Sequence, residues 1–322
     1  MKISILVPVY NEEELIINCL KSLINQDYPK KDYEIIVIND GSKDNTKKNI
    51  EEFIKENKKV KIKLINQENK GLASTRLIGA RNAKYENLFF IDSRCKAQEN
   101  LLSKLKEKDY SPIVSTVLIN KEDYIGRFHY LFRKKLYGKS YMQGKFERFF
   151  ITEENFEKVP SGAGILFIKK DLFLESQFDN IESKNCSDDI KLSRNIVKKK
   201  PILRDPEIIV SYKPRSNLTS HLKHVFHRGP KFIDYHLKLG DKYLLPIIVC
   251  IFLPIFSFIL LTINLKIFFI LYIILFILCI VTFLYLSEEI KDFFILSFLL
   301  PITFIFFYFG ILKGIVLKLA NK

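Results

Sequence analysis

The sequence predicts an α/β fold in which a mixed, mostly parallel sheet is flanked by helices, followed by a C-terminal membrane segment. Up to Lys242, short apolar runs alternate with amphipathic, helix-like segments, the pattern of consecutive β-α-β units. Several of these apolar runs end abruptly in polar residues. Beyond Tyr243 the chain is almost wholly apolar, as expected of helices that lie in a bilayer.

The positive charge of the chain is concentrated before the apolar segment. The 322 residues include 51 Lys and Arg against 36 Asp and Glu, but only five Lys and three acids follow residue 242. A basic domain beside a membrane segment suggests an anionic membrane face or a phosphate-bearing substrate. No nucleic-acid module is recognisable, so we expect no nucleic acid partner. The five cysteines show no C-x-x-C spacing, which indicates a reducing compartment for the polar domain.

The first 92 residues predict four strands separated by three helices. The strands are the apolar runs at 3–9, 33–38, 60–65 and 88–91. Asn11 is expected to cap the first helix, whose opening turn Glu12-Glu13-Glu14 suits the positive end of the helix dipole. Asp44 or Asn45 is expected to cap the second helix, and the third covers 71–83. Strands that alternate with helices in this way pair in parallel through right-handed crossovers.

Polar clusters follow these strands and should meet at one edge of the sheet. They are Tyr10-Asn11-Glu12, Asn39-Asp40, Asn69-Lys70-Gly71 and Asp92. The carboxyl ends of parallel strands are where open α/β sheets bind ligands. Lys70 and Arg76 add positive charge suited to a phosphate. Each cluster alone could be an ordinary cap or turn, but four at one edge favour a binding site.

The second half of the polar region predicts a mixed pattern. Strands are expected at 112–119, 165–168 and within 201–212, and helices at 171–175, 188–199 and 216–238. Residues 124–150 are rich in basic and aromatic side chains. They could form a membrane-surface or acceptor-binding face, or a solvated basic helix with a core stripe.

Three features of this half could carry chemistry. Asp188 and Asp189 open a helix, where they could simply cap it or could include a general base kept ionised by the helix dipole. Gly162 and Gly164 lie in a turn before a strand and would permit close approach of a ligand to the backbone. In the helix at 216–238, His221, His224 and His227 could share a metal, but a basic interfacial helix is the favoured interpretation.

The last 80 residues contain three segments long enough to cross a membrane, at 243–263, 267–286 and 293–312. Basic residues before the first place the polar domain in the cytoplasm, as a multi-pass protein of the cell membrane. A third full crossing would put Lys313, Lys318 and Lys322 outside, against that rule, so one segment could be interfacial or re-entrant. Pro246 and Pro254 make the first segment a candidate, and the number of crossings stays open.

Taken together, these motifs resemble those of glycosyltransferase family 2, the inverting nucleotide-sugar enzymes of GT-A fold. The resemblance covers residues 1 to about 240 and rests on the order of several short motifs: Val7-Pro8-Val9-Tyr10-Asn11-Glu12, Ile38-Asn39-Asp40-Gly41-Ser42, Asn69-Lys70-Gly71-Leu72-Ala73-Ser74-Thr75-Arg76, Phe90-Ile91-Asp92-Ser93, Gly162-Ala163-Gly164 and Asp188-Asp189. It implies a GT-A domain at 1–215, a basic interfacial helix or linker at 216–242, and a membrane domain at 243–322 with two or three transmembrane helices.

The resemblance also implies roles for individual residues. Those expected to bind the nucleotide sugar are Pro8, Tyr10, Glu12, Asp40, Lys70, Arg76, Asp92 and Arg94. Asp189, with Asp188 beside it, matches the acid that deprotonates the acceptor hydroxyl. Gly162, Gly164 and Arg228 are expected on the acceptor side. Asp92 is the first acid of the DxD motif and the candidate metal ligand.

The second acid of that motif is replaced by Arg94. The family implies Mg²⁺ or Mn²⁺, which an arginine cannot bind, but a guanidinium can place fixed positive charge on a diphosphate. One hypothesis is that Arg94 replaces the metal partly or wholly. The alternative is that Arg94 points away, and that Asp92 with a distant ligand still holds the ion.

We therefore predict a membrane-anchored, hexosyltransferase-type enzyme that moves one sugar from a nucleotide-diphosphate donor to a hydroxyl of a lipid-linked or cell-envelope glycan. Polymer synthesis is disfavoured because processive relatives carry Q-x-x-R-W and this chain has no Trp. Two alternatives remain open. One is a polyprenyl-phosphate glycosyltransferase, whose anionic acceptor needs no base. The other is a non-catalytic relative that binds nucleotide sugar. The donor sugar, the nucleotide, the acceptor and the oligomeric state are not specified by the sequence.

Overall fold

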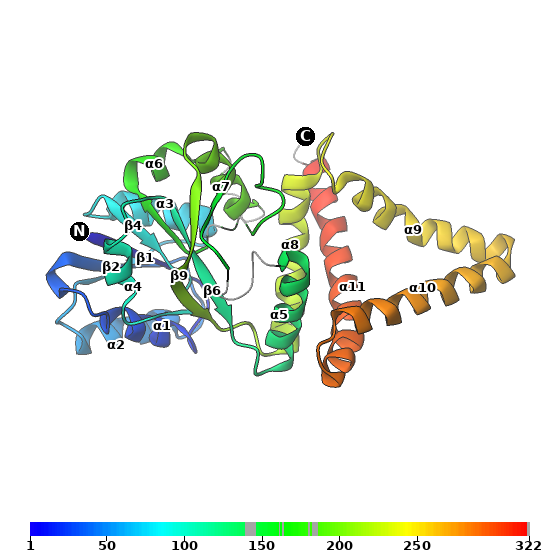
Figure 1. Cartoon of the computed structure of the whole chain (residues 1–322), viewed down its shortest axis with the longest axis horizontal. Helices are drawn as coiled ribbons and strands as arrows, with labels where there is room; N and C mark the ends of the chain where they lie inside the picture. The colour runs from blue at the N-terminus through cyan, green and yellow to red at the C-terminus, as the bar shows by residue number, and fades with distance from the viewer. Residues whose placement is uncertain (139–145, 161, 163, 180, 182–185, 321–322) are drawn as a thin grey trace. The chain divides into compact units, whose positions relative to one another are not determined.

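The computed structural model describes residues 1–138, 146–160, 162, 164–179, 181 and 186–320 (Figure 1). Parts of the basic aromatic stretch (Lys139, Tyr141 and Lys145) and the C-terminal Lys322 lie outside this range. The chain forms two compact units. The first contains Met1–Asn120, Tyr137–Lys184 and Asp188–Pro214, and the second contains Lys121–Leu136, Asn185–Ser187 and Arg215–Lys322.

One nine-stranded sheet organises the first unit. Its strands are β1 (Ile3–Val9), β2 (Tyr33–Asn39), β3 (Ile62–Asn66), β4 (Asn87–Phe90), β5 (Cys95–Ala97), β6 (Ile113–Ile119), β7 (Phe149–Ile151), β8 (Leu166–Lys169) and β9 (Ile202–Tyr212). The order is β3-β2-β1-β4-β8-β6-β9-β5, with β7 also paired to β9. The first four in this order are parallel, as are β6 and β9, whereas β8, β5 and β7 pair antiparallel. The predicted mixed, mostly parallel sheet is confirmed.

Helices cover both faces of this sheet (Figure 1). They are α1 (Ile16–Ile24), η1 (Lys30–Asp32), α2 (Thr46–Glu56), α3 (Leu72–Asn82), α4 (Leu101–Lys106), α6 (Lys170–Glu175) and α7 (Asp188–Lys199). Alternating β1 side chains separate two cores. Ile5 and Val7 pack with α1, α2 and α4, whereas Leu6 packs with α3, α6 and α7. Burial of both faces explains why the central strands read as unbroken apolar runs.

The predicted start of the first helix is wrong. α1 begins at Ile16, and Asn11 adopts a positive φ of 52° instead of capping it. The Asn11 side chain accepts a hydrogen bond from the Lys43 amide at 2.8 Å. Glu13 Oε2 accepts one from the Asn45 amide at 2.8 Å, at the N-terminus of α2. These polar residues therefore bind the loop after β2, and do not cap their own helix.

The second unit is all-helical in the described residues. It contains α5 (Tyr124–Tyr137, whose last residue belongs to the first unit), α8 (Leu218–His236), α9 (Leu244–Ile263), α10 (Leu265–Leu286) and α11 (Ile290–Ala320). Asn217 caps α8, since its Oδ1 accepts from the Thr219 amide at 2.8 Å. Figure 1 shows α8 and α11 side by side, and α9 and α10 leaving them as a hairpin.

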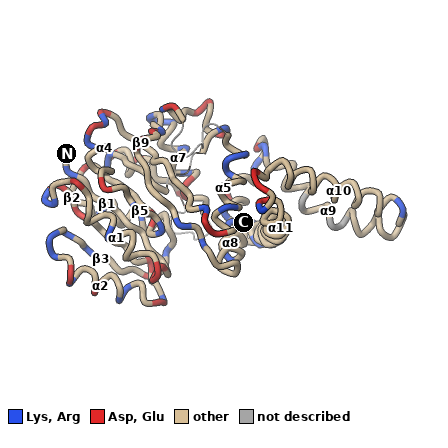
Figure 2. Tube along the Cα trace, turned by 60° about the horizontal axis from the view of Figure 1, so that its bottom comes forward, with Lys and Arg blue, Asp and Glu red and all other residues tan. Residues whose placement is uncertain are grey.

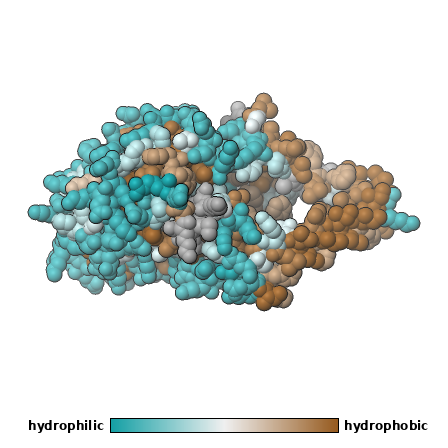
Figure 3. All heavy atoms as spheres, viewed as in Figure 1, coloured by the Kyte–Doolittle hydropathy of each residue, from teal (hydrophilic) through white to brown (hydrophobic). Residues whose placement is uncertain are grey.

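Two of these helices, α10 and α11, are long and apolar enough to cross a membrane. α9 qualifies only as a bent pair, Leu244–Leu253 and Phe256–Ile263, at an angle of 41°. The hairpin of α9 and α10 carries almost no charge and presents a hydrophobic surface (Figures 2 and 3). The predicted apolar C-terminal helices are confirmed, and α11 is longer than the segment predicted at 293–312.

Candidate functional site

The candidate site lies at the carboxyl ends of three neighbouring parallel strands. β2, β1 and β4 are adjacent in the sheet, and polar residues follow each of them. Asp40 comes after β2, Tyr10 and Glu12 after β1, and Asp92 after β4. Parallel strands end at the same edge, so the sheet brings these side chains to one side.

Asp40 organises the loop that precedes α3. Its carboxylate is only 5% exposed and accepts hydrogen bonds from the amides of Lys70 (2.8 Å) and Gly71 (2.9 Å) and from the Gln67 side chain (2.7 Å). Gly71 has a φ of 90°, and its backbone reaches Asp40 in this conformation. The sequence did not predict this contact. Asp40 therefore fixes the loop that carries Lys70, whose own side chain is exposed.

Arg76 joins α3 to the two acids at the start of α7. Its Nη1 donates to Asp188 Oδ2 at 3.1 Å and to Asp189 Oδ1 at 2.7 Å. Arg76 and Asp188 are buried, whereas the Asp189 side chain is 41% exposed. Burial alone would lower the pKa of Arg76, but the charges of Asp189, Asp188 and Asp92 outweigh it and raise this pKa. One guanidinium thus holds a buried and an accessible carboxylate side by side.

Asp92 and Arg94 form a tight turn after β4. Asp92 Oδ1 accepts the Arg94 amide at 2.8 Å, and Arg94 Nη1 lies 3.5 Å from Glu12 Oε2. The Arg94 side chain is 12% exposed, and its buried Nε and Nη1 have no hydrogen-bond acceptor among the described residues. The guanidinium therefore keeps hydrogen-bonding capacity for an anion at this edge of the sheet.

These residues do not fit a divalent cation. Mg²⁺ and Mn²⁺ bind oxygen ligands, and here a guanidinium stands where the second carboxylate would be. Within the described ranges, no three His, Cys, Asp or Glu side chains gather into a metal-binding cluster, and this includes the histidines of α8.

Two thiols lie beside the same turn. The Cys95 amide donates to the Asp92 carbonyl at 2.9 Å, and Cys19 Sγ lies 3.8 Å from that oxygen. Burial, and then the charge of Asp92, raise the pKa of both thiols. They are therefore protonated at neutral pH and serve as small packing groups beneath Asp92.

For the remaining predicted site residues, the structure gives burial and surroundings but no contact that indicates a role. Pro8 is buried within β1, and Tyr10 is exposed just after it. A Cβ built on Gly162 or Gly164 would meet nothing within 4 Å, so the described neighbours do not require glycine at either position. Arg228 is exposed on α8, in the second unit.

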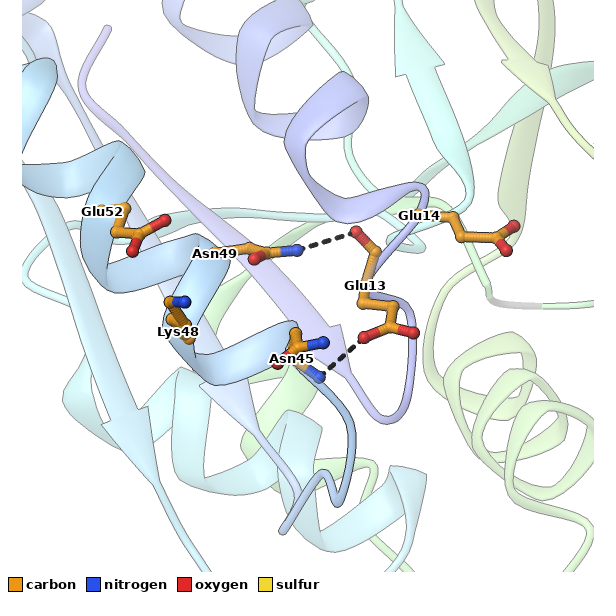
Figure 4. Close-up of a pocket in the computed structure, with 6 residues that line it drawn as sticks. All are labelled: Glu13, Glu14, Asn45, Lys48, Asn49 and Glu52. Carbon is orange, nitrogen blue, oxygen red and sulfur yellow. Dashed lines mark hydrogen bonds between the residues drawn. The ribbon is translucent and has the colours of Figure 1, made fainter.

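A separate hollow of about 380 Å³ lies between the turn before α1 and the start of α2 (Figure 4). It is lined by Glu13, Glu14, Asn45, Lys48, Asn49 and Glu52. Figure 4 shows Asn45 and Asn49 bonded to Glu13, at 2.8 and 3.1 Å. None of these six residues belongs to the predicted site.

The family resemblance predicted that Arg76 lies beside the nucleotide. It did not predict the hydrogen bonds of Arg76 to Asp188 and Asp189. A usable signal was present. α3 is otherwise built from small and apolar residues on its buried side, including Ala73, Gly79 and Ala80. A guanidinium in such a helix must find carboxylates when it is buried.

Comparison with known proteins gives a consistent result. Residues 4–170 match the family described as Glycosyl transferase family 2. A poly(ribitol-phosphate) beta-glucosyltransferase of Bacillus spizizenii is 41% identical over 93 residues, which is 29% of this chain and 15% of that protein. The chain thus spans well under two thirds of this relative's length.

Two solved structures share the fold. TarS of Staphylococcus aureus (residues 1–349, with UDP-GlcNAc) gives a TM-score of 0.54 at 17% identity, over 73% of this chain and 67% of that one. A mannosyltransferase from Pyrobaculum calidifontis, solved with GDP-Man and Mn²⁺, gives 0.51 at 15% identity, over 73% and 63%. At these identities the likeness concerns the fold alone.

Proposed function

This chain belongs to glycosyltransferase family 2, and from that premise we propose that it transfers one sugar, with inversion, from a nucleotide-diphosphate donor to a hydroxyl of a lipid-linked or cell-envelope glycan. The relative that acts on poly(ribitol-phosphate) supports an envelope polymer as the class of acceptor. The apolar C-terminal helices support a site of action at a membrane.

The observation that carries the proposal is the group of Arg76, Asp188 and Asp189. Asp189 is exposed enough to meet an acceptor, and its Oδ1 is held by Arg76. In the proposed step Asp189 takes the proton of the acceptor hydroxyl, and the hydroxyl oxygen forms a bond to the anomeric carbon. The bond from that carbon to the diphosphate oxygen breaks on the opposite side, which inverts the configuration.

The departing diphosphate needs positive charge. We assign this role to Arg94, because its guanidinium retains hydrogen-bonding capacity beside Asp92. Lys70 lies after β3, on the loop that Asp40 fixes, and is a second candidate cation. The donor set does not fit Mg²⁺ or Mn²⁺, so no step is assigned to a metal ion.

The remaining assignments follow the family pattern. Pro8, Tyr10, Glu12 and Asp40 would line the nucleotide pocket at the carboxyl ends of β1 and β2. Gly162, Gly164 and Arg228 would contact the acceptor. Residues 1–215 would act as the catalytic domain, 216–242 as an interfacial segment, and 243–322 as the membrane domain of a multi-pass protein with its catalytic part in the cytoplasm.

The test is to incubate the purified full chain with UDP-, GDP- and dTDP-sugars and a lipid extract, with and without EDTA, and to identify the products by mass spectrometry. We expect one donor to be consumed and one glycosylated acceptor to form. Binding of a nucleotide sugar without any product across the panel would contradict the proposal and favour a non-catalytic relative.

The role of Asp189 is tested by Asp189→Asn, which keeps the shape and removes the base. Removal of a positioned general base costs roughly 10²–10⁴-fold in rate. Ser193→Ala, in the same helix, is the matched control and should retain activity. A near-normal rate for Asp189→Asn would point to an acceptor that is already anionic, as in transfer to polyprenyl phosphate.

The role of Arg94 is tested by Arg94→Asp, which restores the two-acid motif. The parent protein should keep its activity in EDTA, whereas the variant should be active only with added Mn²⁺. Complete loss of parent activity in EDTA, restored by Mn²⁺, would overturn this assignment.

A further inference from the structure

Helix α11 has one face covered by protein and one face bare. Its most buried residues are Asp292, Leu296 and Leu299 near its start and Gly310, Ile311 and Gly314 in its second half. The exposed large apolar residues fall between them and include Phe294, Phe298, Ile305, Phe309 and Val316. The bare face is therefore a continuous apolar stripe along the whole helix.

The polar helices α5 and α8 contact the other face, together with the end of α10 at Phe283 and Leu286. Near its start, α5 contributes Arg127, whose Nε and Nη2 bind the two oxygens of the fully buried Asp292 at 2.8 Å each. Ile125, Phe128 and Leu131 of α5 pack against Leu296 and Leu299 below this ion pair.

From about residue 303 onward, α8 lies beside α11 and runs parallel to it. His221 Nε2 lies 3.0 Å from Thr303 Oγ1, and Lys318 Nζ donates to the Leu237 carbonyl at 2.7 Å. Between these ends, a Cβ on Gly229 would lie 2.1 Å from the carbonyl carbon of Gly310, so the two backbones touch. α8 thus follows α11 over residues 303–318.

α8 is too polar for the centre of a bilayer. It carries Lys223, Arg228, Lys231, Asp234 and four histidines within 19 residues. Charged side chains at that depth are costly and need partners or water. Because α8 and α11 are in backbone contact, a crossing by α11 would draw α8 into the hydrocarbon core.

The charged residues of α11 lie towards its two ends, outside the uncharged run 293–312. Lys291 pairs with Glu289 at 2.7 Å, Asp292 with Arg127, and Lys318 with α8. Lys313 lies over the ring of Phe226 on α8, 5.3 Å from its centroid. α5 and α8 thus supply the polar side of a group of helices whose other side is the apolar stripe of α11, an arrangement suited to a membrane surface.

We propose that α11 does not cross the membrane but lies in the plane of its surface, with the stripe from Phe294 to Val316 against the acyl chains and with α5 and α8 toward the headgroups and water. The hairpin of α9 and α10 then enters the bilayer and returns. This inference rests on the proposed membrane attachment.

This arrangement accounts for the distribution of positive charge. With α11 in the surface plane, Lys313 and Lys318 lie on the same side as Lys223, Arg228 and Lys231 of α8. A crossing helix would instead carry the C-terminal lysines to the far side, against the preference of basic residues for the cytoplasmic side.

The absence of tryptophan from the sequence allows a direct test. Single tryptophans are introduced into the full chain at Phe294, Ile305 or Val316, which lie eleven residues apart on the bare face. The proteins are placed in vesicles of phosphatidylcholine brominated either near the headgroup or deep in the acyl chain. Fluorescence quenching then reports the depth of each tryptophan. Ile274→Trp, in the middle of α10, is the control for a membrane-crossing helix.

The expected result is equal, shallow quenching at all three positions of α11 and deep quenching at Ile274. A crossing α11 would place Phe294 and Val316 about 33 Å apart along the membrane normal. Quenching of Ile305→Trp by deep bromines as strongly as Ile274→Trp would therefore overturn the inference. No quenching along α11 would also overturn it, because another protein surface would then cover the stripe. Loss of deep quenching at Ile274 would instead refute the membrane attachment itself.

Discussion

Removal of the Arg76 guanidinium should destabilise the first unit strongly. Arg76 is 4% exposed and Asp188 is 5% exposed, so Arg76→Met leaves a buried carboxylate without its guanidinium partner. Removing one member of a buried ion pair costs about 3–5 kcal/mol. Asp189 is 41% exposed and regains water, so we assign nearly all of the loss to Asp188. We expect about 3 kcal/mol, measured by urea unfolding of the detergent-solubilised chain followed by tyrosine fluorescence.

A second substitution separates charge from packing. Asp188→Asn in the Arg76→Met background removes the buried charge and should recover about 2 kcal/mol of the loss, since a neutral amide is much cheaper to bury. Lys199→Met, also in α7, is the matched control, because its ion pair with Glu175 at 3.3 Å is exposed on both sides and the variant should lose less than about 1 kcal/mol. Equal stabilities of the single and double variants would refute the reasoning.

Three further predictions concern the second unit, each read by thermal unfolding in detergent. Gly310→Ala should destabilise it by about 1–3 kcal/mol through overpacking, since the added Cβ would lie 2.3 Å from the Phe226 carbonyl oxygen; Gly164→Ala, with open space around it, should be neutral. Arg127→Met should lower the free energy of unfolding by about 3 kcal/mol, because the buried Asp292 carboxylate on α11 loses its guanidinium partner. Burial, and then nearby cations, lower the pKa of His129 to about 3 and of His224 to about 2. These rings are neutral when folded, so stability should be full above about pH 6.5 and fall as the pH drops, by up to about 1.4 kcal/mol per unit for each histidine.

Each of these predictions can fail in a defined way. Equal unfolding midpoints for Gly310→Ala and Gly164→Ala would mean that the backbones of α8 and α11 do not touch. A stable Arg127→Met protein would show that Asp292 is solvated. Replacement of both histidines by Gln should reduce the slope of stability against pH between pH 7 and 5, with a remainder from His221 and His227, whose pKa values burial also lowers. An unchanged slope would assign the pH dependence to other groups.

The sheet was predictable because its signals are local. Continuous apolar runs such as those of β1 and β2 identify buried parallel strands, and the observed bounds match closely. The short β5 was missed, since three residues carry too little periodicity, and the helix α4 was missed as well, although α6 of equal length was predicted. The start of α1 was wrong because Asn11 and Glu13 hydrogen-bond a loop more than 30 residues away, and no local rule distinguishes that from helix capping.

The candidate site was predictable as a set of residues but not as a set of contacts. Sequence patterns identified Arg76 and Asp189 separately, and the bond between them spans 113 positions of the chain. The structure shows that connection, and it also shows that the Asp40 carboxylate accepts hydrogen bonds from the loop before α3. Long-range pairing of this kind follows from the packing of α3 and α7 on one face of the sheet, which only the assembled fold defines.

The path of the chain between the two units has a consequence for its synthesis. After β6 the chain enters the second unit for α5 and then returns to the first. The apolar stripe of α5 is completed by residues of α10 and α11, which the ribosome makes much later. At about 5–20 residues per second, α5 waits on the order of ten seconds for these partners. A protein truncated after Pro214 would expose that stripe permanently, so Ile125, Phe128 and Leu131 would need polar replacements to keep it in solution.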